Sequence, residues 1–83
     1  MNKVTFSGAL TIYEVLEAKN TLLAVLEQAT GMEIDLTDVS ELDTAGVQVL
    51  VAIRREAARR GLDLRIRHGS ASKEVFDCYR LGA

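Results

Sequence analysis

The chain contains no proline, only one cysteine and no long apolar run. A single cysteine, Cys78, excludes an internal disulfide and fits a reducing compartment, so we expect a cytoplasmic protein. No basic segment precedes an apolar run, which argues against a secretory signal peptide. The longest apolar stretches fall far short of the roughly 18 residues that a membrane helix needs. We therefore expect no direct insertion into a membrane.

An excess of charge of one sign is also lacking. The net charge is −2, which argues against a general nucleic-acid binder, because such proteins are usually clearly basic. Apolar residues make up 48% of the chain and charged residues 27%, a composition typical of a globular protein. The length allows one hydrophobic core, so we expect residues 1–83 to form a single domain.

Three segments alternate apolar and polar residues, which is the pattern of a half-buried strand. They are Lys3–Ser7, Met32–Leu36 and Leu62–His68. A segment with helical periodicity follows each of them, which gives the order β-α-β-α-β-α. Helices between successive strands imply right-handed crossovers and a mostly parallel sheet. The expected fold class is therefore α/β, a small open sandwich with the helices packed on one face.

Capping signals predict the limits of the first helix. Thr11 followed by Glu14 matches a capping box, so this helix should begin near Ile12. Gly31 is expected to close it as a C-terminal glycine. Six apolar residues should form its buried stripe: Ile12, Val15, Leu16, Leu22, Leu23 and Leu26.

The second helix should run from Thr44 to Arg60 and end at Gly61. One stripe should face the sheet: Gly46, Val49, Leu50, Ile53 and Ala57. A second stripe lies about a quarter-turn away: Val47, Val51, Arg54 and Ala58. Either this second stripe touches a neighbouring helix, or it is an apolar patch with Arg54 available to a partner carboxylate.

The last helix should follow a turn at residues 69–71, with Ser72 as its cap. Its apolar residues are Val75, Phe76, Tyr79 and Leu81. Within it, Cys78 lacks an activating base and is expected to pack in or near the core. Tyr13 and Tyr79 should be partly buried, and a structural role is expected for His68.

The segment Asp35–Leu50 concentrates carboxylates and hydroxyls before an apolar helix. A loop that leaves a strand and enters a helix is where open α/β sheets usually place their working residues. Asp43 is a good helix N-cap, and Thr44 would stand in the first turn with its hydroxyl near free N–H groups. The small residues Ala45 and Gly46 would let another chain approach closely.

Three further polar residues are expected to support this loop. Asp38 and Ser40 suit turns, because their side chains can bond nearby backbone N–H groups. Asp35 should point toward the strand end or solvent. The spacing of the carboxylates is not that of a calcium loop, so we predict no metal site.

The hydroxyl of Thr44 admits two interpretations. Asp43 and Thr44 are a plain helix cap, or they form a binding switch. A phosphate on Thr44 would add about −1.5 to −2 charges near Asp38, Glu41 and Asp43, and a partner matched to a neutral hydroxyl would meet a bulky dianion. No nucleophile, base and orienting group can be assembled from the chain, so we do not expect an enzyme.

The stretch from residue 34 to residue 66 resembles the STAS family, the sulfate-transporter and anti-sigma-factor-antagonist domains. The resemblance rests on Ile34–Asp35–Leu36–Thr37 with Val39, and on Asp43–Thr44–Ala45–Gly46 at the start of a helix. The segments GLDLRI, VFDCYRLGA and FSGALTIYEVLEAKNTLL are also similar to family patterns, so the resemblance covers most of the chain.

The resemblance implies a sheet with helices on one side, no enzymatic activity and no cofactor. It also implies that a partner kinase phosphorylates Thr44 and that the phosphate breaks the complex, with Asp43 supporting Thr44 and Gly46 keeping the approach open. The partner-binding residues are expected to be Asp43, Thr44, Ala45, Gly46, Val47, Val51 and Arg54.

Two kinds of partner remain open. A regulatory adapter of this family would bind a GHKL-type serine/threonine kinase or an anti-sigma factor. The pattern LDTAG is also similar to the STAS subunits of bacterial phospholipid-transport ABC systems, in which the partner is the cytosolic ATPase subunit. An unpaired sheet edge would also permit a homodimer through strand pairing.

Overall fold

The computed structural model describes residues 2–28 and 30–80. Along the chain the elements are β1 (Asn2–Leu10), α1 (Val15–Gln28), β2 (Gly31–Leu42), α2 (Thr44–Arg59), β3 (Asp63–His68) and α3 (Ser70–Cys78). This order confirms the predicted β-α-β-α-β-α arrangement. Leu81, which the sequence placed on the last helix, lies outside the described residues.

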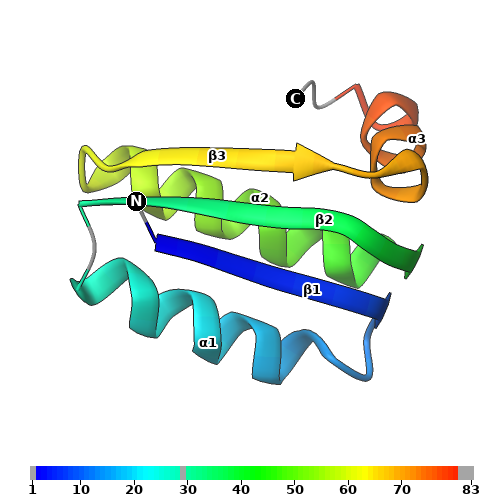
Figure 1. Ribbon diagram of the computed structural model, residues 1–83, viewed down its shortest axis with the longest axis horizontal. Helices are drawn as coiled ribbons and strands as arrows, with labels where there is room; N and C mark the ends of the chain where they lie inside the picture. The colour runs from blue at the N-terminus through cyan, green and yellow to red at the C-terminus, as the bar shows by residue number, and fades with distance from the viewer. Residues whose placement is uncertain (1, 29, 81–83) are drawn as a thin grey trace.

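The three strands form one parallel sheet in the order β1-β2-β3. Val4 pairs with Ile34, and Ile34 pairs with Ile66, so equivalent apolar residues lie side by side across the sheet. Helices α1 and α2 run alongside the sheet, while α3 lies beyond the carboxyl end of β3 (Figure 1). The carboxyl ends of the strands therefore meet at the end of the molecule where α2 begins and α3 packs.

The core lies between the sheet and the helices. Met32, Ile34 and Leu36 alternate along β2 and are fully buried, because their face of the sheet is covered. From α2, Leu50 and Ile53 complete this layer. The predicted sheet-facing stripe of α2 is confirmed: four of its members are buried, and Val49 is half-buried.

The opposite face of the sheet is polar. Glu33 pairs with Lys3 on one side and with Arg65 on the other. Asp35 pairs with Arg67 in the same way. Opposite charges on neighbouring strands favour this register. A shift of one strand by one residue would also bring its apolar side chains to the polar face.

Strand β2 is longer than predicted and includes most of the acidic segment that was expected to be a loop. Asp38 and Ser40 were expected in a loop, but both lie in β2, which continues to Leu42. The partner strand β1 extends equally far and pairs Leu10 with Leu42, after two register shifts. Pairing with a neighbouring strand has therefore overridden the turn preference of these residues.

The start of α1 also differs from the prediction. Glu14 Oε1 accepts a hydrogen bond from the Thr11 backbone N–H at 2.9 Å, as a capping box requires, but the regular helix begins only at Val15. Ile12 and Leu16, which the sequence placed in the buried stripe, are 61% and 70% exposed. Ala18, which lies between the expected positions, is buried instead.

Two predicted end signals were wrong, and one was correct. Gly31 opens β2 rather than closing α1. Ser72 does not cap α3, because the N-cap is Gly69 and the helix already begins at Ser70. The Ser72 hydroxyl instead reaches back to accept from the Gly69 N–H at 3.1 Å. Gly61 ends α2 as predicted, in a left-handed conformation with φ of 69° that favours glycine.

Candidate functional site

The amino-terminal end of α2 is held by Asp43. Its backbone is extended, and one carboxylate oxygen accepts from the Gly46 N–H at 2.9 Å, which makes it the predicted N-cap. The other oxygen accepts from the Ile12 N–H at 3.0 Å. The Gly46 N–H is the main cause that lowers the pKa of Asp43, and the Ile12 N–H adds to it. Asp43 thus joins the segment after β1 to the start of α2.

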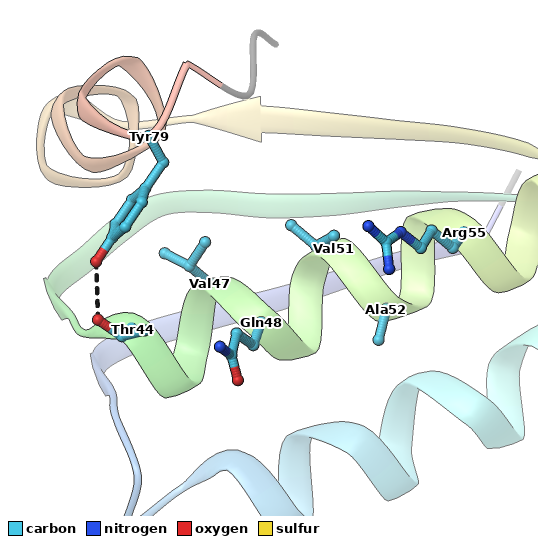
Figure 2. A pocket seen from close by; sticks show the side chains of 7 residues that line it. All are labelled: Thr44, Val47, Gln48, Val51, Ala52, Arg55 and Tyr79. Atoms are coloured by element: carbon cyan, nitrogen blue, oxygen red, sulfur yellow. Dashed lines mark hydrogen bonds between the residues drawn. The ribbon is translucent and has the colours of Figure 1, made fainter.

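Thr44 is the first residue of α2, and its side chain is exposed. Its Oγ1 lies 2.8 Å from the phenol oxygen of Tyr79, which comes from the end of α3 (Figure 2). No local pattern in the sequence indicates this pair, because 35 positions separate the two residues. Tyr79 is 48% exposed, so this hydroxyl pair lies at the surface of the molecule.

A groove of about 470 Å³ begins at this pair and follows α2. Tyr79 lies at the Thr44 end of the groove, and Arg55 lies further along α2 (Figure 2). The groove is lined by Thr44, Val47, Gln48, Val51, Ala52, Arg55 and Tyr79. It therefore offers an apolar floor with a hydroxyl pair near one end and a cation near the other.

A second groove, of about 460 Å³, lies between α1 and α2. Ile12, from the segment before α1, and Val15, from α1, line one side of it. Ala45 and Gln48 of α2 line the other side. The exposed side chain of Ile12 is explained by this groove, since it lies at the groove rather than under the sheet. Gln48 and Ala52 line both grooves, so α2 lies between two hollow surfaces over several turns.

Gly46 is buried, and the reason for a glycine there lies within the chain. A Cβ atom at this position would collide with the backbone carbonyl oxygen of Leu10 and lie 2.7 Å from Leu42 Cδ1. The end of β1 therefore occupies the space that the sequence interpretation reserved for an approaching partner. That reason for the glycine was wrong, because Gly46 allows α2 to pack against β1.

The remaining partner-binding candidates differ in how much of them is accessible. Ala45, Val51 and Arg54 are half-buried. Val47 is only 4% exposed and belongs to the core, so it can offer little surface to another protein. Of the predicted second stripe of α2, Val47 and Val51 line the groove beside Thr44, whereas Arg54 and Ala58 are not among the residues that line it.

The three residues expected to support the loop lie on β2. Asp38 and Ser40 are exposed there, whereas Asp35 is buried rather than directed to solvent. Its Oδ1 accepts from the Thr37 N–H at 2.9 Å and from the Thr37 hydroxyl at 2.7 Å, and its other oxygen pairs with Lys3 at 3.2 Å. The hydrogen bonds from Thr37, aided by Lys3, lower the pKa of Asp35 from 3.8 to about 2.

This depressed pKa predicts how Asp35→Asn changes the stability. A carboxylate with a lowered pKa stabilises the folded chain above its unfolded pKa of 3.8, and this contribution is lost as the pH falls toward 2. We expect Asp35→Asn to lower the urea midpoint near neutral pH, and the difference from the parent to shrink steadily below about pH 4. Urea titrations across this range measure it.

The matched control is Asp63→Asn, because Asp63 lies at the exposed start of β3 with only a 3.7 Å ion pair to Arg65. Its midpoint should stay close to that of the parent at every pH. A constant difference for Asp35→Asn from neutral to acid pH would contradict the assignment, since it would show that the charge of Asp35 contributes nothing.

Two of three residues outside the predicted site are more exposed than the sequence suggested. Cys78 is exposed, so its expected core packing is wrong. Tyr13 is 90% exposed rather than partly buried, and it precedes the first residue of α1. His68 packs its ring against Phe76, with the ring centres 4.5 Å apart, and burial lowers its pKa. The structural role expected for His68 is thus consistent with its contacts.

Residues 2–28 and 30–80 contain neither a membrane-spanning helix nor a metal cluster. No helix in these ranges combines the length and hydropathy needed to cross a bilayer. Nor do three or more histidine, cysteine, aspartate or glutamate side chains in the same ranges gather closely enough to hold a metal ion.

The chain is similar to known proteins in sequence family and in fold. A family model described as "Mlab, STAS domain" matches residues 2–82. The structure is similar to that of the anti-sigma factor antagonist SpoIIAA in its unphosphorylated form, with a TM-score of 0.73 and 17% sequence identity over 90% of this chain and 71% of that chain. At this identity the similarity establishes a shared fold. No curated protein matches the chain by sequence.

Proposed function

Because this chain belongs to the STAS domain family, we propose that it is a non-enzymatic regulatory adapter that phosphorylation of Thr44 releases from its partner. The proposed partner is a protein, either a GHKL-type serine/threonine kinase or an anti-sigma factor. The observation that carries the proposal is the position of Thr44, an exposed residue with a hydroxyl group at the start of α2 and at one end of an apolar groove.

The groove supports protein docking because it joins apolar surface to specific polar groups. Val51 and Ala52 offer contact area, while Thr44 and Arg55 offer hydrogen bonds at separate points along α2. Interfaces of this kind gain affinity from the apolar centre and orientation from the polar groups around it. The hydroxyl of Thr44 can therefore contribute to the fit without being the main source of affinity.

The electrostatic surroundings of Thr44 support a switch. A helix amino terminus normally binds a phosphate through its free backbone N–H groups. Here the carboxylate of Asp43 already binds the Gly46 N–H, and a phosphate on the adjacent Thr44 would have to compete with it. The added charge of about −1.5 to −2 would remain beside Asp43, so a partner fitted to the neutral hydroxyl should be repelled.

The proposed reaction transfers the γ-phosphoryl group of ATP to Thr44 Oγ1. A new oxygen–phosphorus bond forms, the bond to the β-phosphate breaks, and a base of the kinase takes the hydroxyl proton. The partner kinase supplies the ATP, the magnesium ion and the base. This chain supplies the acceptor alcohol on a fixed helix end.

A candidate GHKL-type kinase with magnesium and ATP tests the proposal. Intact-mass measurement should show one added phosphate on the parent chain and none on Thr44→Ala. Thr44→Asp should weaken binding by at least about 30-fold, the effect of losing a strong interface contact. Thr44→Ser, which keeps the alcohol, should still be phosphorylated and should bind like the parent.

A second candidate function uses the same surface without a switch. It is that of the STAS subunit of a phospholipid-transport ABC system, which the pattern LDTAG at residues 42–46 resembles. Here the groove beside Thr44 would hold the cytosolic ATPase subunit permanently. Co-purification with that subunit, no phosphate on Thr44 and unchanged binding by Thr44→Asp would together favour this function and overturn the adapter.

A further inference from the structure

The hydrogen bond between Tyr79 and Thr44 occupies the group on which the proposed switch depends. A threonine hydroxyl has one donor and two acceptor positions. The phenol oxygen lies 2.8 Å from Oγ1, so one of these positions is already used, whichever group donates. Figure 2 shows the phenol reaching from α3 to the first residue of α2, at the end of the groove.

The backbone that carries this phenol is firmly held. Phe76 and Ser72 anchor α3 in the interior, where they are 1% and 0% exposed. The Tyr79 backbone N–H donates to the Val75 carbonyl at 3.1 Å and ends the helix. The α-carbon of Tyr79 is therefore fixed relative to Thr44, because α3 cannot shift without disturbing the core.

The side chain of Tyr79 is held much less firmly than its backbone. It is 48% exposed, and its one described hydrogen bond is the bond to Thr44. Rotation about the side-chain torsions can carry the ring away from Thr44 without moving α3. A net contribution of one neutral hydrogen bond corresponds to about a 2- to 10-fold preference for the closed position.

We propose that Tyr79 is a latch, whose phenol covers the Thr44 hydroxyl and must swing away before a kinase or another partner can use that hydroxyl. This inference rests on the proposed role of Thr44. It makes Tyr79 a positioning residue that links the last helix to the start of α2. A phosphate on Thr44 would also hold the latch open, because its oxygens fill the space that the phenol occupies.

The latch itself can be measured without any partner. The chain has no tryptophan and two tyrosines, so Tyr13→Phe leaves Tyr79 as the only strong intrinsic fluorophore. In that background, Thr44→Val removes the hydroxyl and keeps the shape of the side chain. We expect acrylamide to quench Tyr79 more strongly after Thr44→Val, by up to about 2-fold, since the closed position loses its hydrogen bond.

The consequence for the switch is measured with Tyr79→Phe, which removes only the phenol oxygen. Thr44 should be phosphorylated about 2- to 10-fold faster than in the parent. The reason is that in the parent only the molecules with the phenol turned away can react. Tyr13→Phe, which removes the phenol oxygen of a tyrosine that is 90% exposed, should leave the rate unchanged. The melting temperature of Tyr79→Phe should fall by no more than about 10 °C, the effect of losing one hydrogen bond in a domain of this size. The variant should remain folded at the assay temperature, which separates the latch from a folding effect.

Each outcome decides between the two proposals. Equal quenching of Tyr79 before and after the Thr44→Val substitution would overturn the latch and leave the adapter standing. Equal phosphorylation rates for the parent and Tyr79→Phe would do the same. If neither the parent nor Tyr79→Phe takes up phosphate, the proposed adapter function is overturned. The latch is then also overturned as a device that limits phosphorylation of Thr44.

Discussion

Replacing Gly46 with alanine is expected to lower the free energy of unfolding by about 3 kcal/mol or more, although alanine is the better helix former. In an open helix, glycine to alanine gains up to about 1 kcal/mol. At Gly46 the new methyl group would collide with the carbonyl oxygen of Leu10, and backbone atoms cannot turn aside as a flexible side chain can. Forcing α2 away from β1 costs more than helix propensity returns, as in other overpacked sites. Urea denaturation followed by circular dichroism measures the loss.

Gly61→Ala is the matched control for this prediction. Gly61 has a φ of 69°, but a Cβ there would meet no atom within 4 Å. Its replacement should cost about 1 to 2 kcal/mol from the left-handed backbone alone. If Gly46→Ala is as stable as the parent, the close packing of α2 against the end of β1 is refuted.

Truncating Phe76 to alanine should cost about 3 to 5 kcal/mol, the range found for phenylalanine in other protein cores. Phe76 is 1% exposed and packs against the ring of His68, so its removal leaves a cavity where α3 meets the sheet. A chain of this length typically has about 4 to 12 kcal/mol of total stability, which makes the loss large enough to unfold it or to release α3. Thermal melts together with hydrogen exchange in α3 distinguish these two results.

Tyr13→Ala serves as the control for Phe76→Ala, because it removes an aromatic ring that is 90% exposed. Its effect should stay within about 0.5 kcal/mol. A similarly small effect of Phe76→Ala would mean that α3 is held by other contacts. Those contacts, and not Phe76, would then fix the backbone that carries Tyr79.

The sequence predicted the element order and the second helix well, for identifiable physical reasons. The apolar residues of α2 recur at a helical period along its whole length, and Asp43 and Gly61 mark its ends with distinct chemistry. Both signals are local, so no knowledge of the rest of the chain is needed. The parallel sheet then follows from helices that separate successive strands.

The errors lie where distant contacts decide the structure. Asp38 and Ser40 look like turn residues, but the length of β1 determines how far β2 continues. Ile12 and Leu16 fit a buried stripe by spacing, yet Ile12 precedes the regular part of α1 and both side chains are exposed. Periodicity can identify an apolar face, but it does not tell how much of that face a neighbour covers.

The candidate site was predicted in its local part and missed in its distant part. Asp43 and Thr44 were identified because capping follows a sequence rule that spans only a few residues. Their contact with Tyr79 depends on where α3 returns to the sheet, and the buried Asp35 depends on its bonds to Thr37 and Lys3. Pairs of this kind need the folded chain.

The strand order has a consequence for how the molecule assembles. Since β1, β2 and β3 are neighbours in the order in which they are synthesised, no strand has to insert between two that are already paired. Each pairing joins residues about 30 positions apart, such as Val4 with Ile34 and Ile34 with Ile66. The sheet of the described residues can therefore grow at one edge as the chain leaves the ribosome, and α3, which carries Tyr79 to Thr44, follows the three strands.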